Sequence, residues 1–281
     1  MQYENHSNLT TLITHFIKVS NSIKGQNSTE QQKYGEAIAR KVFSHICSVY
    51  SLSRGHKLLL SDDSNITFVD HASMAILTRA ALESYLTFNH IFIVAPTVEE
   101  RLFRFQCWDL AGCVERINMK TICPLDDEQR KVLGEDKERL AKLLVAIEQI
   151  ELYKNLKKGL KTNLEKYGKW RLDKSWADLV SGANFDKNYF EDTDSYLCSY
   201  AHTGRSSALQ VMHAYELGSQ TQLAESYLDW ILVILSKFFF DYLTFIPELE
   251  YAFESSKQAV EVAEKWKWVG ENCGKVPITD L

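Results

Sequence analysis

The chain has 281 residues, of which 45% are hydrophobic and 25% are charged, with only 4 Pro and 12 Gly. This composition excludes a collagen-like or low-complexity architecture and a largely disordered chain. The formal net charge of −5 excludes a strong overall attraction to nucleic acid or to an anionic membrane.

Helical periodicity dominates the first half of the chain. Apolar residues recur there at intervals of three and four, which is the spacing of one buried helix face. Either Ser64 or Asp70 could cap one such run and Thr97 the next, since all three are typical N-cap residues, and Pro96 separates the two runs. The helices expected in this half cover residues 10–22, 30–52, 64 or 70 to 94, and 97–119.

The second half continues the helical pattern with one irregular stretch. Asp126 opens an acidic first turn, which the helix dipole favours, and Asp192 to Asp194 are typical of a cap for a helix from Ser195. Residues 154–182 are less regular and more basic. The helices expected here cover residues 126–150, 195–216, 221–246 and 248–268.

No run alternates convincingly between apolar and polar residues, and no β-hairpin turn signal stands out. The sequence therefore predicts an all-α fold, a single-domain bundle of about eight or nine helices over residues 1–269. Residues 270–281 are expected to form a flexible C-terminal tail.

The six cysteines contain no CxxC pair, so we expect reduced thiols in a cytoplasmic protein and no metal site. No signal peptide is recognisable. The most apolar stretch, residues 228–246, carries Asp229, Lys237 and Asp241 on one side, which favours a helix buried in a bundle over a membrane span.

A narrow polar stripe crosses the apolar helix expected over residues 71–94. Arg79, Glu83 and His90 lie within about 40° of one another on a helical wheel. Charged groups on an otherwise apolar helix need partners, because burying an unpaired charge is costly. The stripe predicts either an Arg79–Glu83 ion pair that fixes helix packing or a polar pocket at the centre of the bundle.

A second polar stripe follows in residues 195–216. In one continuous helix, His202, Ser206 and His213 would share a face, whereas Thr203-Gly204 could break that helix. Tyr200, His202, Arg205 and Ser206 together could bind an anion or perform acid–base chemistry. The alternative is a satisfied hydrogen-bond cluster between helices.

The segments ILTRAALESYLTFNHI and YLCSYAHTGR, about 110 residues apart, resemble an uncharacterised bacterial all-helical family. That family pairs an Arg-x3-Glu helix with a later Ser/Tyr-x-x-His segment. The matching positions are Arg79, Glu83, Ser199, Tyr200 and His202. Because the family has no settled activity, the resemblance implies a shared polar site and little more.

Arg40 and His45 form an Arg-x4-His motif that is similar to the motif of HEPN-superfamily ribonucleases. The resemblance implies that His45 helps to deprotonate a ribose 2′-OH while Arg40 holds the scissile phosphate, without metal. The chain departs from that family, because Lys41 replaces a small polar residue and the motif lies early in the chain.

Residues 151–174 carry eight Lys/Arg and three Asp/Glu. The interleaved aromatic residues are Tyr153, Tyr167, Trp170 and Trp176. Cations with stacking rings are typical of single-stranded nucleic-acid binding, which makes Lys158, Lys161 and Trp170 candidate RNA contacts. The alternative is a solvated helix face whose aromatic rings turn to the core.

Two functions follow as hypotheses. The first is a metal-independent, cofactor-free ribonuclease of a bacterial defence or toxin system, with RNA as partner. In it His202 is the acid or base, Arg205 and Arg79 hold phosphate, and Glu83 orients Arg79. The residues expected to line the substrate are Tyr200, Ser206, His90, Lys158, Lys161 and Trp170.

The second hypothesis is a non-enzymatic helical binding or interaction module. The aromatic residues near the C-terminus would also suit the interface of a homodimer. An enzyme pocket should be open to water and lie beside residues 151–174. Structural polar groups should instead be closed off, with each group paired internally.

Overall fold

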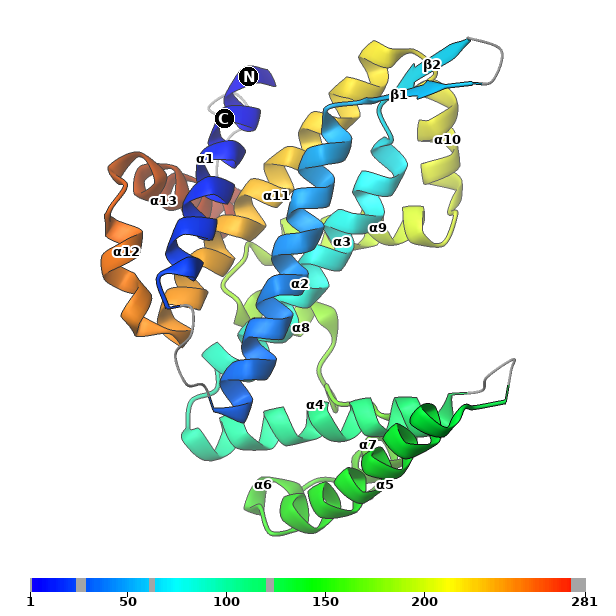
Figure 1. Cartoon of the computed structure of the whole chain (residues 1–281), viewed down its shortest axis with the longest axis vertical. Helices are drawn as coiled ribbons and strands as arrows, with labels where there is room; N and C mark the ends of the chain where they lie inside the picture. Colours follow the sequence, from blue (N-terminus) through cyan, green and yellow to red (C-terminus); the bar gives the residue numbers. More distant parts are fainter. Residues whose placement is uncertain (1, 24–28, 61–63, 120–123, 274–281) are drawn as a thin grey trace. The chain divides into compact units, whose positions relative to one another are not determined.

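The computed structural model describes residues 2–23, 29–60, 64–119 and 124–273 (Figure 1). Within these residues it contains thirteen α-helices, one π-helical turn, one 3-10 turn and one β-hairpin. The prediction of an all-α fold is confirmed, whereas the expected number of eight or nine helices is wrong.

The contacts divide the chain into two compact units. Unit 1 comprises residues 1–89 and 179–281, and unit 2 comprises residues 90–178. The elements of unit 1 are α1 (Gln2–Asn21), α2 (Glu30–Ser53), β1 (His56–Leu59), β2 (Asn65–Phe68), α3 (His71–Phe88), α9 (Lys187–Ala201), α10 (Arg205–His213), α11 (Leu217–Phe245), η2 (Pro247–Leu249), α12 (Glu250–Glu254) and α13 (Lys257–Asn272), with η1 (Asn89–Ile93) and α8 (Trp176–Gly182) at its junctions with unit 2. Unit 2 contains α4 (Val98–Asn118), α5 (Asp127–Glu148), α6 (Glu151–Lys154) and α7 (Lys158–Tyr167).

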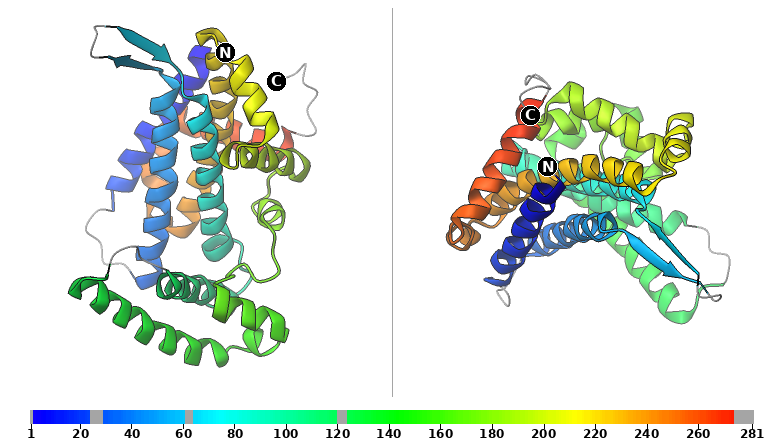
Figure 2. Two further views of the ribbon diagram at one scale, coloured as in Figure 1. Left: turned by 90° about the vertical axis from the view of Figure 1, so that its right-hand side faces the viewer. Right: turned by 90° about the horizontal axis from the view of Figure 1, so that it is seen from above.

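Helices α2, α3 and α11 run side by side at the centre of unit 1 (Figures 1 and 2). Helix α11 is apolar almost all round, and its side chains from Ile231 to Phe239 are buried. Burial of such a helix on every side is what removes its apolar surface from water. At Gly35 of α2, a Cβ atom would lie 2.4 Å from the Phe245 ring, so glycine permits the close approach of α2 and α11.

The capping signals in the sequence mark true helix starts. The side chains of Asp70, Thr97 and Asp126 each accept a hydrogen bond from a backbone N–H in the first turn of the helix that follows. The cap expected at residues 192–194 is wrong, because α9 begins earlier, with Asp186 as its N-cap. The apolar helix α11 also begins earlier than expected, at Leu217.

The structure has more helices than expected because stretches predicted as single long helices are divided into shorter ones. Residues 195–216 are divided between α9 and α10, and residues 248–268 between α12 and α13. The irregular stretch from 154 to 182 contains two short helices, α7 and α8, and the short helix α6 ends at its first residue. Helix α13 continues through Asn272, past the start of the expected tail at residue 270, and residues 274–281 lie outside the described part of the chain.

One helix expected to reach Val94 ends sooner. Helix α3 stops at Phe88, and residues 89–93 form the π-helical turn η1. A π turn adds one residue to the hydrogen-bonded ring and so changes the direction in which later side chains point. The helical-wheel position expected for His90 therefore does not hold.

The β-hairpin of β1 and β2 was not expected from the sequence. Its strands pair His56 with Phe68 and Leu59 with Asn65, and Figure 2 shows the hairpin, which connects α2 to α3, projecting away from the ends of these helices. Most of its residues are exposed on both faces, so no buried face imposes the alternation by which strands are recognised. The Gln220 side chain of α11 accepts a hydrogen bond from Val69 N at 2.9 Å and ties the base of the hairpin.

Unit 2 has a core of its own between α4, α5 and α7. The residues of that core are Phe103, Cys107, Leu110, Val114, Ile147, Tyr153 and Leu164. Two ion pairs join α4 to α5, Arg139 with Asp109 and Arg116 with Asp136. Because Arg139 donates to both Asp109 oxygens, that pair fixes the register of the two helices.

No single helix in the described ranges is long and apolar enough to cross a membrane. The bent pair of Leu217–Phe245 with Pro247–Glu254 meets the criteria of length and composition only when its two parts are taken together. The cysteines that the structure describes are free thiols, and Cys123 lies outside the described residues.

Candidate functional site

The first polar stripe is an ion-pair cluster between α3 and α9. Arg79 Nε donates to Glu83 Oε1 at 3.0 Å, and its Nη2 lies 2.9 Å from the same oxygen. Asp194 Oδ1 of α9 lies 4.0 Å from Arg79 Nε. The three side chains are only 19–29% exposed, so Arg79 is held between two carboxylates in a partly buried place.

An aromatic hydroxyl cluster lies on α9 and α11 in the same unit. The hydroxyls of Tyr196 and Tyr227 lie 3.2 Å apart, and Tyr200 donates to Gln210 Oε1 at 2.9 Å. Burial raises the pKa of Tyr200 to about 12 and raises that of Tyr227 further. The Tyr200 and Tyr227 hydroxyls therefore stay protonated at neutral pH and do not act as bases.

The second polar stripe is broken at residues 203 and 204. Helix α9 ends at Ala201, Thr203 has a φ of 53°, and Gly204 is the N-cap of α10. A β-branched residue with positive φ is unusual and marks a tight reversal. His202, Ser206 and His213 therefore do not share one helix face, and of the two alternatives the structure has the break at Thr203-Gly204.

Serine hydroxyls close this reversal. Ser199 Oγ and Ser206 Oγ lie 2.7 Å apart, and Ser207 Oγ donates to the carbonyl oxygens of Ser199 and Gly204. His202 and Arg205 are exposed on either side of the turn. The hydroxyl of the candidate binding residue Ser206 is thus hydrogen-bonded within the turn, and the two candidate catalytic side chains face solvent.

The two stripes approach each other at Asp194, not at His202. His202 follows Asp194 by eight residues, which is about 12 Å of helical rise. The structure therefore brings Arg79 and Glu83 to the middle of α9, while His202 and Arg205 lie at its C-terminal end.

His90 is bound within unit 2. Arg104 of α4 donates to the His90 carbonyl oxygen at 2.7 Å, and its Nη1 lies 3.3 Å from His90 Nδ1. Burial, and then the positive charges of Arg104, Lys174 and Arg171, lower the pKa of His90 to about 4. Its ring is neutral at physiological pH, so His90 does not supply a cation for phosphate.

The basic segment 151–174 keeps most of its lysines in solvent but not most of its rings. Tyr153 is buried and Trp170 packs against the core of unit 2, whereas Tyr167 is 56% exposed. Lys158 is exposed. Lys161 Nζ donates to the Lys154 carbonyl oxygen at 3.1 Å and lies 4.7 Å from the centre of the Tyr153 ring.

The Arg-x4-His motif lies on α2. Arg40 is exposed, whereas His45 is half-buried and its Nε2 has no hydrogen-bond partner among the described residues. Burial, and then the charge of Lys41, lower the pKa of His45. The ring is thus neutral, but the nitrogen that would take up a proton is shielded from solvent.

Sequence reasoning missed a buried polar group between α3 and α11. Tyr85 Oη and Asn89 Nδ2 each donate to Asp241 Oδ2 at 2.7 Å. On the same helix, Lys237 Nζ lies 2.7 Å from Glu271 Oε1 of α13. The signal was the polar side of residues 228–246, because charges on so apolar a helix require partners on its neighbours.

Among the described residues, no group of three or more His, Cys, Asp or Glu side chains is arranged to hold a metal ion. Comparison of the chain with family models, with curated proteins and with solved structures finds no match.

Proposed function

We propose that this chain is a non-enzymatic helical binding protein in which the polar stripes of unit 1 stabilise the fold. The observation that carries the proposal is the internal pairing of the stripe residues Arg79, Glu83, Tyr200 and Ser206. Arg79 is bound by Glu83 and Asp194, and Tyr200 is bound by Gln210. Paired and partly buried polar groups are what interhelical packing requires.

The electrostatics of the Arg79 cluster also disfavour phosphate binding. One guanidinium stands between two carboxylates, so its positive charge is already balanced within the chain. A phosphate would have to displace a carboxylate and be repelled by the second. Within the polar stripes, the ribonuclease hypothesis therefore depends on His202 and Arg205, two exposed side chains at the end of α9.

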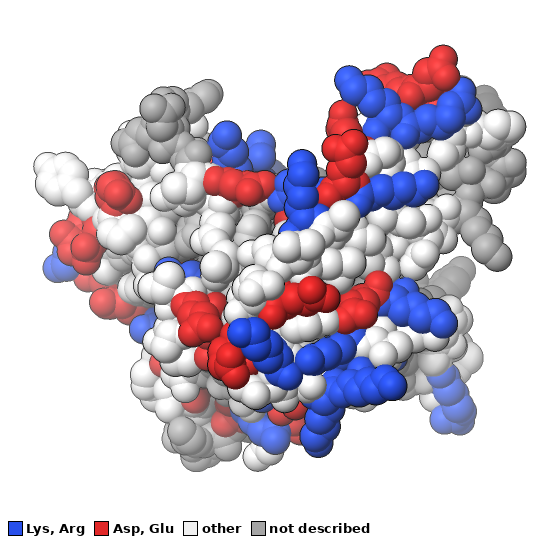
Figure 3. All heavy atoms as spheres, turned by 90° about the horizontal axis from the view of Figure 1, so that it is seen from below, with Lys and Arg blue, Asp and Glu red and all other residues white. Residues whose placement is uncertain are grey.

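For the partner we propose single-stranded RNA, bound weakly by unit 2 through residues 151–174. The exposed lysines of this segment include Lys157, Lys158, Lys166 and Lys169, and Tyr167 offers an exposed ring for stacking. On the face that Figure 3 shows, Lys and Arg side chains alternate with Asp and Glu rather than forming one continuous basic surface. Binding to such a surface is expected to be weak and to fall steeply with salt.

RNA cleavage in EDTA tests the non-enzymatic part of the proposal. We expect the wild-type chain, His202→Ala and His45→Ala to leave a panel of RNAs equally intact. Cleavage by the wild type that is lost in a folded His202→Ala variant contradicts the proposal and supports the ribonuclease hypothesis. Loss confined to His45→Ala points instead to the Arg-x4-His motif.

RNA binding tests the partner. Replacing Lys158 and Lys166 together by Gln is expected to weaken binding of a labelled oligonucleotide several-fold and to reduce its salt dependence. The matched control replaces Lys137 and Lys142, two exposed lysines of α5 in the same unit, by Gln. Equal losses in both double variants, or no binding by the wild type, contradict RNA as the partner.

A further inference from the structure

A pocket of about 500 Å³ lies within unit 2, between the end of α4 and the first half of α5. Its apolar walls include Met119, Leu125, Val132 and Leu133. Met119 and Val132 are 65% and 43% exposed, so the walls are open to solvent. The pocket uses none of the residues of the polar stripes or of segment 151–174.

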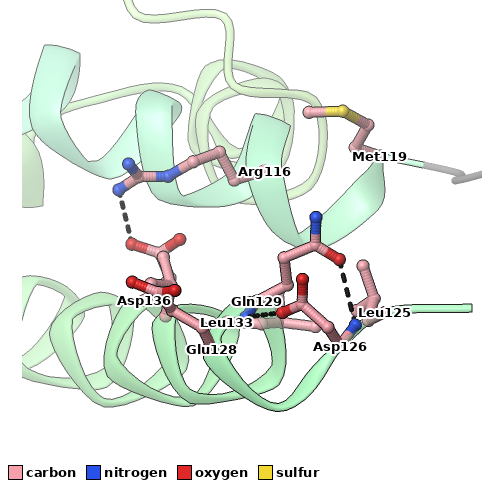
Figure 4. A pocket seen from close by; sticks show the side chains of 9 residues that line it. Arg116, Met119, Leu125, Asp126, Glu128, Gln129, Leu133 and Asp136 are labelled. Atoms are coloured by element: carbon pink, nitrogen blue, oxygen red, sulfur yellow. Dashed lines mark hydrogen bonds and ion pairs between the residues drawn. The ribbon is translucent and has the colours of Figure 1, made fainter.

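A buried carboxylate contributes to the lining of the pocket. Asp136 is only 5% exposed, and its Oδ1 forms an ion pair with Arg116. Its Oδ2 is buried and has no hydrogen-bond partner within the described ranges of the chain. Figure 4 shows Arg116 of α4 facing Asp136 of α5. A carboxylate oxygen left without a donor is costly, so a second donor beside Asp136 would be stabilising.

The charges of the lining residues indicate which charge a ligand of this pocket should carry. Among the described residues that line the pocket, one cation, Arg116, stands against three carboxylates, Asp126, Glu128 and Asp136. Asp126 is already used as the N-cap of α5, where its side chain and that of Gln129 form a capping box. The acidic groups that remain exceed the single Arg116 charge, so the pocket favours a cation over an anion.

Arg116 is positioned to give way to such a ligand. Its side chain is 55% exposed, so the guanidinium can move into solvent at little cost in desolvation. Asp136 Oδ1 is then available to a donor that enters through the pocket, and the apolar walls cover the rest of the ligand.

From this geometry we infer that the pocket between α4 and α5 is a binding site for a small organic cation, an ammonium or guanidinium group on an apolar arm. The cationic group pairs with Asp136, and the arm packs against Leu125, Val132 and Leu133. This site is independent of RNA binding by residues 151–174.

The test uses the full chain and 4-phenylbutylammonium as the probe, titrated while backbone amide NMR shifts are recorded. We expect saturable shifts at the pocket residues Met119, Gln129 and Val132. Asp136→Asn is expected to weaken binding at least tenfold, because it removes the charge of the ion pair. The matched control Asp127→Asn changes an aspartate on the same helix whose side chain is 99% exposed and outside the pocket, and it should bind like the wild type.

Two neutral or anionic analogues separate charge recognition from apolar binding. 4-Phenylbutanol and 4-phenylbutyrate have the same arm, and we expect both to bind at least tenfold more weakly than the ammonium. Val132→Trp fills the open wall without altering the charges and should abolish the shifts, which keeps the test valid if Asp136→Asn does not fold. Equal binding of the three probes, unchanged affinity in Asp136→Asn, or no saturable shift with the wild type overturns the inference.

Discussion

Two largely buried side chains, His90 in unit 2 and Asp229 in unit 1, have pKa values shifted towards their neutral forms. Burial is the main cause in both, lowering the pKa of His90 to about 4 and raising that of Asp229 to about 6. A neutral histidine becomes charged by taking up a proton as pH falls, whereas a neutral carboxyl group becomes charged by losing one as pH rises. The two residues therefore make the stability of the protein depend on pH in opposite directions.

His90 is expected to destabilise the fold in acid. Its pKa is about 4 when folded and about 6.5 when unfolded, so the unfolded chain binds more protons between these values and stability falls as pH drops from 6.5 to 4. We predict that His90→Gln removes about 2 kcal/mol of this loss. Urea unfolding at pH 7 and pH 4.5 measures it, and an unchanged difference between the two pH values would show that His90 is not held neutral.

Asp229 is expected to destabilise the fold at neutral pH. Its folded pKa lies above the unfolded value of 3.8, so the penalty is fully present above pH 6 and absent below pH 3.8. Asn5 Nδ2 donates to Asp229 Oδ1 at 2.7 Å, a bond that an asparagine oxygen can also accept. We predict that Asp229→Asn raises the free energy of unfolding by about 1–2 kcal/mol at pH 7.5 and has little effect at pH 4. A destabilised variant at pH 7.5 contradicts this reasoning.

At the scale of elements, the reversal between α9 and α10 depends on one glycine. A Cβ atom at Gly204 would lie 2.4 Å from Ser199 Oγ, inside the group of serines that closes the turn. Gly204→Ala must therefore displace Ser199 and its hydrogen bonds, and we predict a loss of about 1–3 kcal/mol.

Gly218→Ala is the matched control for Gly204→Ala. Gly218 lies in the first turn of α11, and a Cβ atom there meets nothing within 4 Å. A helical Gly→Ala change in open space is expected to be neutral or to stabilise by about 0.5 kcal/mol. Thermal unfolding followed by circular dichroism compares the two variants, and similar melting temperatures contradict the role given to Gly204.

The elements also show what the sequence could reveal and what it could not. Asp70 and Thr97 were predictable as caps because an N-cap depends on residues two or three positions away. The Arg79–Glu83 pair was predictable for the same reason. Asp126 was expected in the acidic first turn of its helix, and the structure makes it the N-cap. The pairing of Asp194 with Arg79 was not predictable, because a helical wheel gives the direction of a side chain but not the helix that faces it.

The hairpin and the π turn escaped prediction for related reasons. The exposed hairpin has no buried face to impose alternation, and a π turn at residue 89 carries no reliable signature in the sequence. The break at Thr203 was noted as an alternative because glycine follows it, but only the fold decided between one helix and two.

On the scale of the whole molecule, the two units differ in charge. Unit 2 contains 17 Lys and Arg against 15 Asp and Glu, whereas unit 1 contains 15 against 22. The net charge is therefore +2 for unit 2 and −7 for unit 1. Although the chain as a whole is negative, unit 2 is the part better suited to an anionic partner.

Unit 2 is expected to fold alone, because it is continuous in sequence and has its own core of apolar residues from α4, α5 and α7. We predict that a fragment of residues 90–178 gives a helical circular dichroism spectrum and a cooperative unfolding transition. An unfolded fragment would instead support the single domain over residues 1–269 that the sequence suggested.

We expect the Arg79 cluster to stabilise the fold of unit 1. The most direct test is the free energy of unfolding of Arg79→Met, with Arg40→Met on the exposed face of α2 as its matched control. We predict a loss of about 1–2 kcal/mol for Arg79→Met, because Glu83 and Asp194 lose their partner, and a change within about 0.5 kcal/mol for Arg40→Met. Adding Glu83→Gln to Arg79→Met should recover part of the loss. An Arg79→Met variant as stable as the wild type, or more stable, contradicts the claim, since side chains kept for function rather than for folding are often replaced without loss of stability.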